Sequence, residues 1–273
     1  MLKMMNRSQL LYIPLILLGL VFIIPFGIMI IGSLLNMTLP IGNPFTWVVH
    51  EKFSFANFGY IFKNAPYLKW IINSLIITII PVFSNMFFSA ILGYIFARKQ
   101  FFGREVIFWI MMAVIMIPSQ LLIIPRYIMF SDLGWINTYL PLIVPEIWGI
   151  MGVFFVRQYM MTMPKDLEEA AYIDGAGDFT VFFKVYLPLA KPVIATVGTF
   201  AFIGNWNDLL TPLIFTTSDE MYPVTVGLAS LLTKEGNFGV EMAGSVLSFI
   251  PTFLIFIFFQ RYFVKGITLT GIK

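Results

Sequence analysis

Six long apolar stretches dominate this sequence and decide what it can fold into. They cover about residues 10–35, 70–97, 106–125, 139–156, 192–217 and 242–260. A helix needs about 20 apolar residues to cross the hydrocarbon core of a bilayer. Only 11% of the residues are charged, against about 25% in ordinary soluble domains. The sequence therefore predicts an all-α polytopic membrane protein with six transmembrane helices, organised as a single domain over residues 1–273.

The basic residues predict which side of the membrane each segment faces. An even number of crossings puts both termini on one side. If that side is the cytoplasm, the outer segments hold five of the seventeen lysines and arginines, namely Lys52, Lys63, Lys69, Arg126 and Lys234. The inner segments hold the other twelve. Because cytoplasmic loops carry an excess of basic residues, we expect both termini in the cytoplasm.

The composition also excludes several kinds of chemistry. The chain has no cysteine, and its one histidine, His50, cannot build a histidine metal cluster. The net charge of +3 would suggest nucleic acid in a soluble chain, but in a membrane protein it reports topology. The phosphate-binding pattern GxxxxGK[ST] is missing from the sequence. We therefore expect a chain that is not an enzyme and binds no metal, cofactor or nucleic acid.

Residues 157–191 form the only sizeable cytoplasmic segment. Pro164 suits a first helical turn, and the acidic residues after it favour a helix N-terminus, so a short helix is expected over about 164–174. Gly175 fits the left-handed backbone conformation in which many helices end. A second amphipathic piece should place four aromatic side chains on one face until Pro188 and Pro192 end it; these are Phe179, Phe182, Phe183 and Tyr186.

The same segment carries a long ungapped motif. It consists of Glu169, Ala170, Ala171, Gly175, Val185, Leu187 and Pro188. This pattern resembles the signature of ABC importer permeases, in the cytoplasmic loop where that family carries it. The alternative reading is an amphipathic hairpin that rests on the lipid surface.

Other stretches are similar to the carbohydrate-uptake branch of these permeases, the branch of the second maltose-type membrane subunit. They are Ile173 to Ala176, Asn205 to Asp208 with Pro212 and Leu213, Pro223 to Leu228, and Gln260 to Thr268. The resemblance extends over nearly the whole chain from about residue 10. One departure lies in the tail, where Thr270 and Gly271 replace the usual Gly-Ala pair.

The resemblance implies a type I ABC importer permease fold with cytoplasmic coupling helices, in a bacterial-type inner membrane. Such a subunit moves a sugar, oligosaccharide or related polyol inward by alternating access. The implied partners are a second permease subunit, two ATPase subunits that hold ATP and Mg, and an extracytoplasmic solute-binding protein. The resemblance also implies that Glu169 and the two alanines sit in a groove of an ATPase subunit; we expect Gly175 to set the turn and Asp174 to support it.

Two carboxylates lie inside predicted spans, Glu146 in the fourth and Asp208 in the fifth. At 1.5 Å per residue each lies roughly 10 Å from the outer end of its span, so they can share a level. With Asn205, Trp206 and Asn207 they could line a sugar path by hydroxyl bonding and ring stacking. Equally, they could pair with a sister subunit or be wet near the interface.

A different class of function competes with the importer. In an ion-coupled secondary transporter, Glu146 and Asp208 would form a proton relay. That reading leaves the motif in residues 157–191 unexplained. An intramembrane enzyme is set aside because no histidine, cysteine or acid cluster has suitable spacing.

Overall fold

The computed structural model describes residues 12–39 and 52–268. These residues are almost entirely helical, and between them they form only an isolated bridge of Leu35 with Phe53 in place of a sheet. His50, Thr270 and Gly271 lie outside the described residues. The helices are, in chain order, α2 (Tyr12–Ser33), α4 (Ala56–Asn64), α5 (Tyr67–Arg98), α6 (Arg104–Ile115), η1 (Ser119–Leu122), α7 (Ile123–Asp132), α8 (Leu140–Ile143), η2 (Val144–Glu146), α9 (Ile150–Met161), α10 (Asp166–Ile173), α11 (Asp178–Val181), η3 (Phe182–Tyr186), α12 (Leu187–Leu189), α13 (Lys191–Asn207), α14 (Leu210–Phe215), α15 (Val224–Glu235) and α16 (Phe238–Thr268).

The chain divides into two compact units. The first takes Met1–Tyr67 with Leu228–Ile250. In it the end of α2 packs on the start of α16, where Gly32 lies against Met242. Asn57 of α4 donates hydrogen bonds to the carbonyls of Ser33 and Leu35, at 2.9 and 2.8 Å. These bonds satisfy carbonyls that the end of α2 would otherwise leave unpaired.

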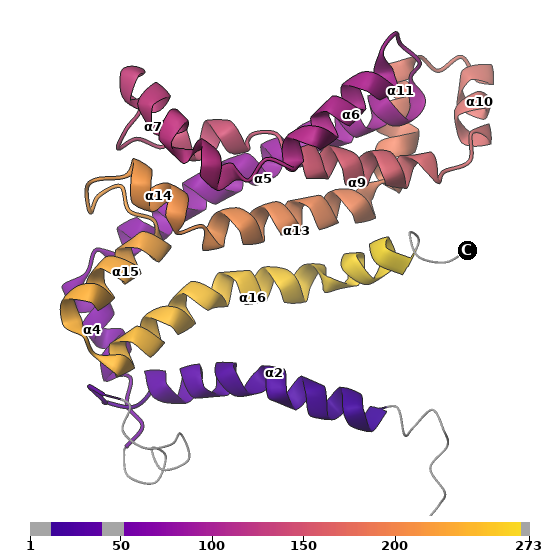
Figure 1. Cartoon of the computed structure of the whole chain (residues 1–273). Coiled ribbons are helices and arrows are strands. Elements are labelled where there is room, and N and C mark those ends of the chain that lie inside the picture. Colours follow the sequence, from indigo (N-terminus) through magenta and orange to yellow (C-terminus); the bar gives the residue numbers. More distant parts are fainter. Residues whose placement is uncertain (1–11, 40–51, 269–273) are drawn as a thin grey trace, which may run out of the picture. The chain divides into compact units, whose positions relative to one another are not determined.

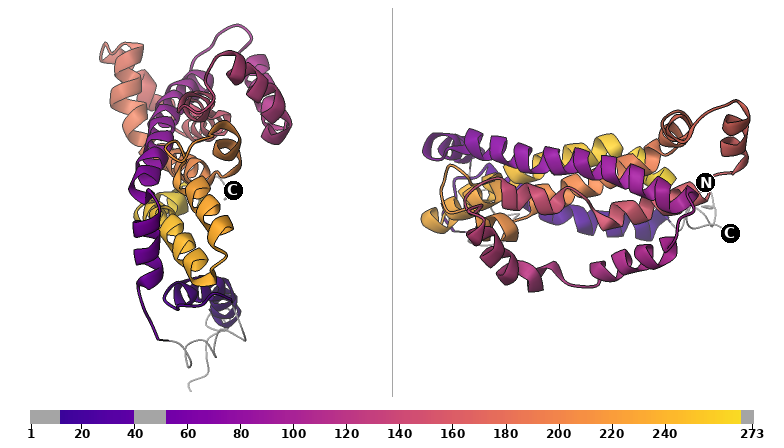
Figure 2. Two further views of the ribbon diagram at one scale, coloured as in Figure 1. Left: turned by 90° about the vertical axis from the view of Figure 1, so that its left-hand side faces the viewer. Right: turned by 90° about the horizontal axis from the view of Figure 1, so that it is seen from above.

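The second unit, Leu68–Gly227 with Pro251–Lys273, contains the site residues discussed below. Here α5, α9 and α13 run side by side (Figures 1 and 2). Their backbones approach closely because small residues face large ones: Gly93 of α5 lies against Val156 of α9. Membrane helices commonly pack through small residues in this way. A buried cluster of this unit includes Tyr94, Val156 and Tyr186.

Length and composition identify the helices that can cross a membrane. Four single helical stretches of the described residues qualify: Tyr12–Ser33, Tyr67–Arg98, Leu140–Met161 and Phe238–Tyr262. The number rises to six if each of two bent helix pairs counts as one span. The all-helical membrane fold expected from the sequence is therefore what the chain forms.

The third and fifth predicted spans are not straight helices. In the third, α6 stops at Ile115 and the chain resumes at Ser119 after a bend of 85°. Pro118 lies directly before the new helix, where its ring suits a helix start but not a helix interior. The fifth predicted span, residues 192–217, breaks at Asp208 between α13 and α14.

The two outer segments expected as loops also contain helices. Helix α4 lies within residues 36–69, and α15 lies within residues 218–241. In α15, Val224, Leu228 and Leu231 are buried and recur at helical spacing. In the sequence, the mixed composition of these segments obscures this short helical pattern of apolar residues.

Candidate functional site

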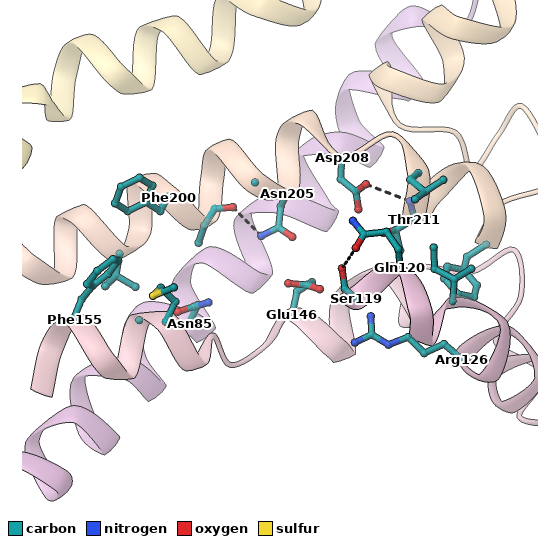
Figure 3. A pocket seen from close by; sticks show the side chains of 18 residues that line it. Asn85, Ser119, Gln120, Arg126, Glu146, Phe155, Phe200, Asn205, Asp208 and Thr211 are labelled. Atoms are coloured by element: carbon teal, nitrogen blue, oxygen red, sulfur yellow. Dashed lines mark hydrogen bonds between the residues drawn. The ribbon is translucent and has the colours of Figure 1, made fainter. Parts of the chain in front are cut away.

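A cavity of about 640 Å³ opens within the second unit. Its walls come from α5, η1, α7, η2, α9, α13 and α14 (Figure 3). The polar lining residues are Asn85, Ser119, Gln120, Arg126, Glu146, Asn205, Asp208 and Thr211. Phe155 and Phe200 line the same space, with ring centroids 5.9 Å apart. The cavity thus has an aromatic and polar lining, and most of its lining residues lie within the predicted spans.

Both intramembrane carboxylates face this cavity. Glu146 ends η2, and Asp208 lies in the break between α13 and α14. The Asp208 carboxylate accepts a hydrogen bond of 3.2 Å from the backbone N–H of Thr211 and thereby caps the start of α14. The two acids therefore lie in one cavity, where they interact electrostatically with each other.

Of the two asparagines proposed for the path, only Asn205 lines the cavity. It lies three residues before Asp208, in the last turn of α13, and both residues line the cavity. Asn207 is exposed and donates to the Ile203 carbonyl at 2.9 Å, outside the cavity lining.

Trp206 does not belong to the cavity lining, and the expectation that it offers a ring for stacking a sugar is wrong in this structure. Only 2% of its surface is exposed. Its ring stacks on Phe202 with a centroid distance of 5.6 Å and an angle of 7°. Since neighbouring helix positions turn by about 100°, Trp206 points into the core beside Val82 while Asn205 faces the cavity.

The cavity also contains residues that the sequence reasoning missed. Arg126 was assigned to an outer loop, but it lies in α7 and interacts electrostatically with Glu146. Asn85, Gln120 and Thr211 complete the polar lining. A basic residue directly after Pro125, at the edge of an apolar stretch, was the available signal for Arg126. The three uncharged residues carry no such signal.

The motif of residues 157–191 forms a helical hairpin, which we define as α10 to α12, Asp166–Leu189. It lies at the end of α5 and α9 that is away from α14 (Figure 1). Helix α10 has three acidic residues in its first turn, which suits the positive end of the helix dipole. Gly175 follows with φ of 81°, the left-handed turn that the sequence predicts.

More than half of the motif residues, and the neighbouring Asp174, are exposed on the hairpin. Glu169, Ala170, Asp174, Gly175 and Pro188 are exposed. Ala171 and Leu187 are partly buried against the core cluster that contains Tyr186. The hairpin therefore has an inner side that holds it to the helices and an outer side that carries Glu169.

The four aromatic residues of the second arm do not share one face. Phe182 and Tyr186 are buried, whereas Phe183 is exposed and Phe179 is 82% exposed. The reason is local: residues 182–186 form a π-helical turn, which shifts the register that the 3.6-residue period assumes. Phe179 and Ile173, which is 86% exposed, are instead exposed apolar side chains on the outer side.

Comparison with known proteins identifies relatives over most of the chain. A family model described as a binding-protein-dependent transport system inner membrane component matches residues 89–269. The arabinooligosaccharides transport system permease protein AraQ of Halalkalibacterium halodurans is 40% identical, over 80% of this chain and 78% of the relative. Its counterpart AraQ of Bacillus subtilis is 34% identical over 94% and 92%. The diacetylchitobiose uptake system permease protein NgcG of Streptomyces coelicolor is 31% identical over 90% and 83%.

The fold has a solved counterpart as well. The crystal structure of a bacterial ABC transporter involved in the import of the acidic polysaccharide alginate superposes with a TM-score of 0.76. The match covers 96% of this chain and 99% of that one, at 21% identity. The fold is thus that of an ABC importer permease and not that of an ion-coupled transporter. Since the family model matches well over half of the chain and the relatives are sugar uptake permeases over most of their length, this chain belongs to the binding-protein-dependent inner membrane components, as a multi-pass permease of the carbohydrate-uptake ABC importers.

Proposed function

We propose that this permease carries a sugar, an oligosaccharide or a related polyol inward through the cavity around Glu146 and Asp208. The observation that carries the proposal is the make-up of the cavity lining. Carboxylates and amides offer hydrogen bonds to sugar hydroxyls, while Phe155 and Phe200 offer apolar faces to the ring carbons. The volume also lies in the range of small-molecule sites, about 300–1,000 Å³. The arabino-oligosaccharide permeases among the relatives make such sugars the first substrates to test.

We infer that the hairpin is the contact with an ATPase subunit, on the cytoplasmic side together with both termini. The exposed Glu169 can pair with basic or amide groups in a groove. Ile173 and Phe179 can bury their exposed apolar surface there, and Ala170 allows backbones to approach. Burying such side chains contributes about 1.5–3 kcal/mol each. Asp174 supports the turn at Gly175 and takes no part in catalysis.

Other chains supply the remaining subunits of the transporter. An ABC importer permease works with another permease, an ATPase and a solute-binding protein. For this chain we propose one second permease subunit, two ATPase subunits that hold ATP and Mg, and one extracytoplasmic binding protein. The exposed apolar surface of α2, including Leu15, Ile16 and Phe22, faces membrane lipid or the second permease.

The test is uptake by the complete complex in proteoliposomes, with arabino-oligosaccharides as the first substrates. Uptake should require internal ATP, should require the binding protein, and should persist when a protonophore collapses the proton gradient. Glu169→Lys should leave the complex assembled but weaken ATP hydrolysis stimulated by the loaded binding protein. Loss of uptake with the protonophore while ATP is present would contradict the proposal.

A further inference from the structure

One lysine joins both arms of the hairpin to the end of α5. Lys99 follows the last residue of α5, and its ammonium nitrogen lies 2.8 Å from Asp178 Oδ1 and 3.4 Å from Glu168 Oε1. It also donates a hydrogen bond of 2.7 Å to the Tyr172 hydroxyl. Glu168 and Tyr172 lie in α10, and Asp178 begins α11. A single side chain therefore contacts both arms.

These partners are also bonded to one another and to the buried core. The Tyr172 hydroxyl donates to Asp178 Oδ1 at 2.6 Å. The hydroxyl of Tyr186, a fully buried residue, donates to Glu168 Oε2 at 3.0 Å. The Tyr186 ring lies 5.2 Å from that of Tyr94 in α5. The polar network on the hairpin thus continues into the packing around α5.

Lys99 and Tyr172 both keep their protons across the physiological pH range. Burial by itself would lower the pKa of Lys99, but its hydrogen bonds to Asp178 and Tyr172 raise that pKa overall. Burial, followed by the hydrogen bond to Asp178, raises the pKa of Tyr172 to about 12. Lys99 is therefore a permanent cation, and the Tyr172 hydroxyl keeps the proton that it donates.

Helix α5 connects this network to the cavity. Asn85 of α5 lines the cavity, and no proline interrupts the chain from Asn85 to Lys99. At 1.5 Å per residue these positions are about 21 Å apart along one rigid helix. The second connection is α13, which starts at Lys191 directly after the hairpin and carries Asn205 into the cavity.

We propose that Lys99 is a positioning residue for energy coupling, because it fastens both hairpin arms to α5 and makes α5 move with the hairpin when an ATPase subunit displaces it. The proposal rests on the docking role proposed for the hairpin. Two of the elements that line the cavity, α5 and α13, then respond to one displacement. Without Lys99 the hairpin keeps its chain connection to α13 and its aromatic packing, but loses these charge-assisted bonds between α10 and the end of α5.

The experiment measures sugar molecules imported per ATP hydrolysed by the reconstituted complex. Lys99→Met should lower this ratio about fivefold or more, the lower end of typical coupling between sites, with the unfolding temperature and the assembly of the complex close to wild type. Lys99→Arg should restore most of the ratio, because a guanidinium can pair with both carboxylates. Lys184→Met changes an exposed lysine of the same hairpin. It should leave the ratio of sugar imported to ATP hydrolysed at the wild-type value.

A milder variant covers the case in which Lys99→Met fails to assemble. The Asp178 side chain is 64% exposed, so Asp178→Asn weakens the ion pair without disturbing the core, and it should lower the ratio in part. If Lys99→Met and Asp178→Asn both couple normally while Glu169→Lys does not, the role of Lys99 is refuted and the docking role of the hairpin stands. If Glu169→Lys also leaves sugar uptake and stimulated ATP hydrolysis normal, the docking role proposed for the hairpin fails, and the inference about Lys99 fails with it.

Discussion

Two asparagines in α13 have the same side chain but different positions, so a comparison of the two shows what position alone decides. The side-chain amide of Asn205 donates to the Ala201 carbonyl at 2.8 Å, and that of Asn207 donates to the Ile203 carbonyl at 2.9 Å. Both residues thus make the same backbone bond four residues back. They face different surroundings because two helical steps turn a side chain by about 200°.

This pair gives a matched test of the cavity. Asn205→Ala should raise the KM for sugar uptake about two- to thirteenfold, the effect of losing one hydrogen bond of about 0.5–1.5 kcal/mol. Asn207→Ala should leave the KM unchanged, since Asn207 is not part of the cavity lining. The measurement is the concentration dependence of uptake in proteoliposomes. Equal KM values for the two variants would show that the cavity is not part of the sugar path.

Gly175 provides a second prediction at the residue scale. A Cβ at this position would meet open space, but φ is 81°, so Gly175→Ala adds about 1–2 kcal/mol of backbone strain alone. Hydrogen exchange in α10 should become faster and sugar uptake should fall, with normal amounts of the protein in the membrane.

Gly177 is the matched control for Gly175. It lies two residues later in the same turn, also in open space, but its φ of −83° suits any residue. Gly177→Ala should therefore leave sugar uptake and the rate of hydrogen exchange in α10 as they are in the unchanged protein. Indistinguishable exchange rates in the two variants would mean that the left-handed turn is not what holds the hairpin.

At the scale of elements, the close packing of α5 on α9 depends on Gly93. A Cβ there would lie 2.6 Å from Val156 Cβ and 3.1 Å from the backbone nitrogen of Arg157. Backbone cannot move aside as a flexible side chain can. Gly93→Ala should therefore cost about 1–3 kcal/mol, as overpacked cores do, and should lower the unfolding temperature in detergent.

Gly59 in α4 is the control for this substitution. It is also a helical glycine, but an added Cβ meets open space. Gly59→Ala should raise stability by up to about 1 kcal/mol, because it lowers the entropy of the unfolded chain. An unfolding temperature for Gly93→Ala as high as that for Gly59→Ala would contradict the close contact of α5 and α9.

For the whole molecule, the prediction is the side of the membrane on which each end of the helices lies. The chain has no cysteine, so single cysteines can be labelled without background. In intact cells an impermeant thiol reagent should label Asp219→Cys, at an exposed position between α14 and α15, and should not label Thr180→Cys in the hairpin. Both should react after the membrane is permeabilised. The opposite pattern would invert the topology and place the hairpin outside.

The sequence by itself determined the membrane character, the family and the turn of the hairpin. Each of these depends on local information: the length of an apolar stretch, the order of residues in the motif around Glu169, or a glycine after a short helix. These features were predictable because neighbouring residues alone fix them.

Only the tertiary structure decided which side chains line the cavity and what Lys99 binds. Arg126 and Asn85 line the cavity with Glu146 because separate helices converge there, and Trp206 is excluded from it because Phe202 and Val82 bury its ring. Lys99 counted in the sequence only as one cytoplasmic charge, but its partners Glu168 and Asp178 lie 69 and 79 residues away. Such contacts depend on helix rotation, on the breaks at Pro118 and Asp208 and on the π-helical turn, and no local pattern of residues fixes these.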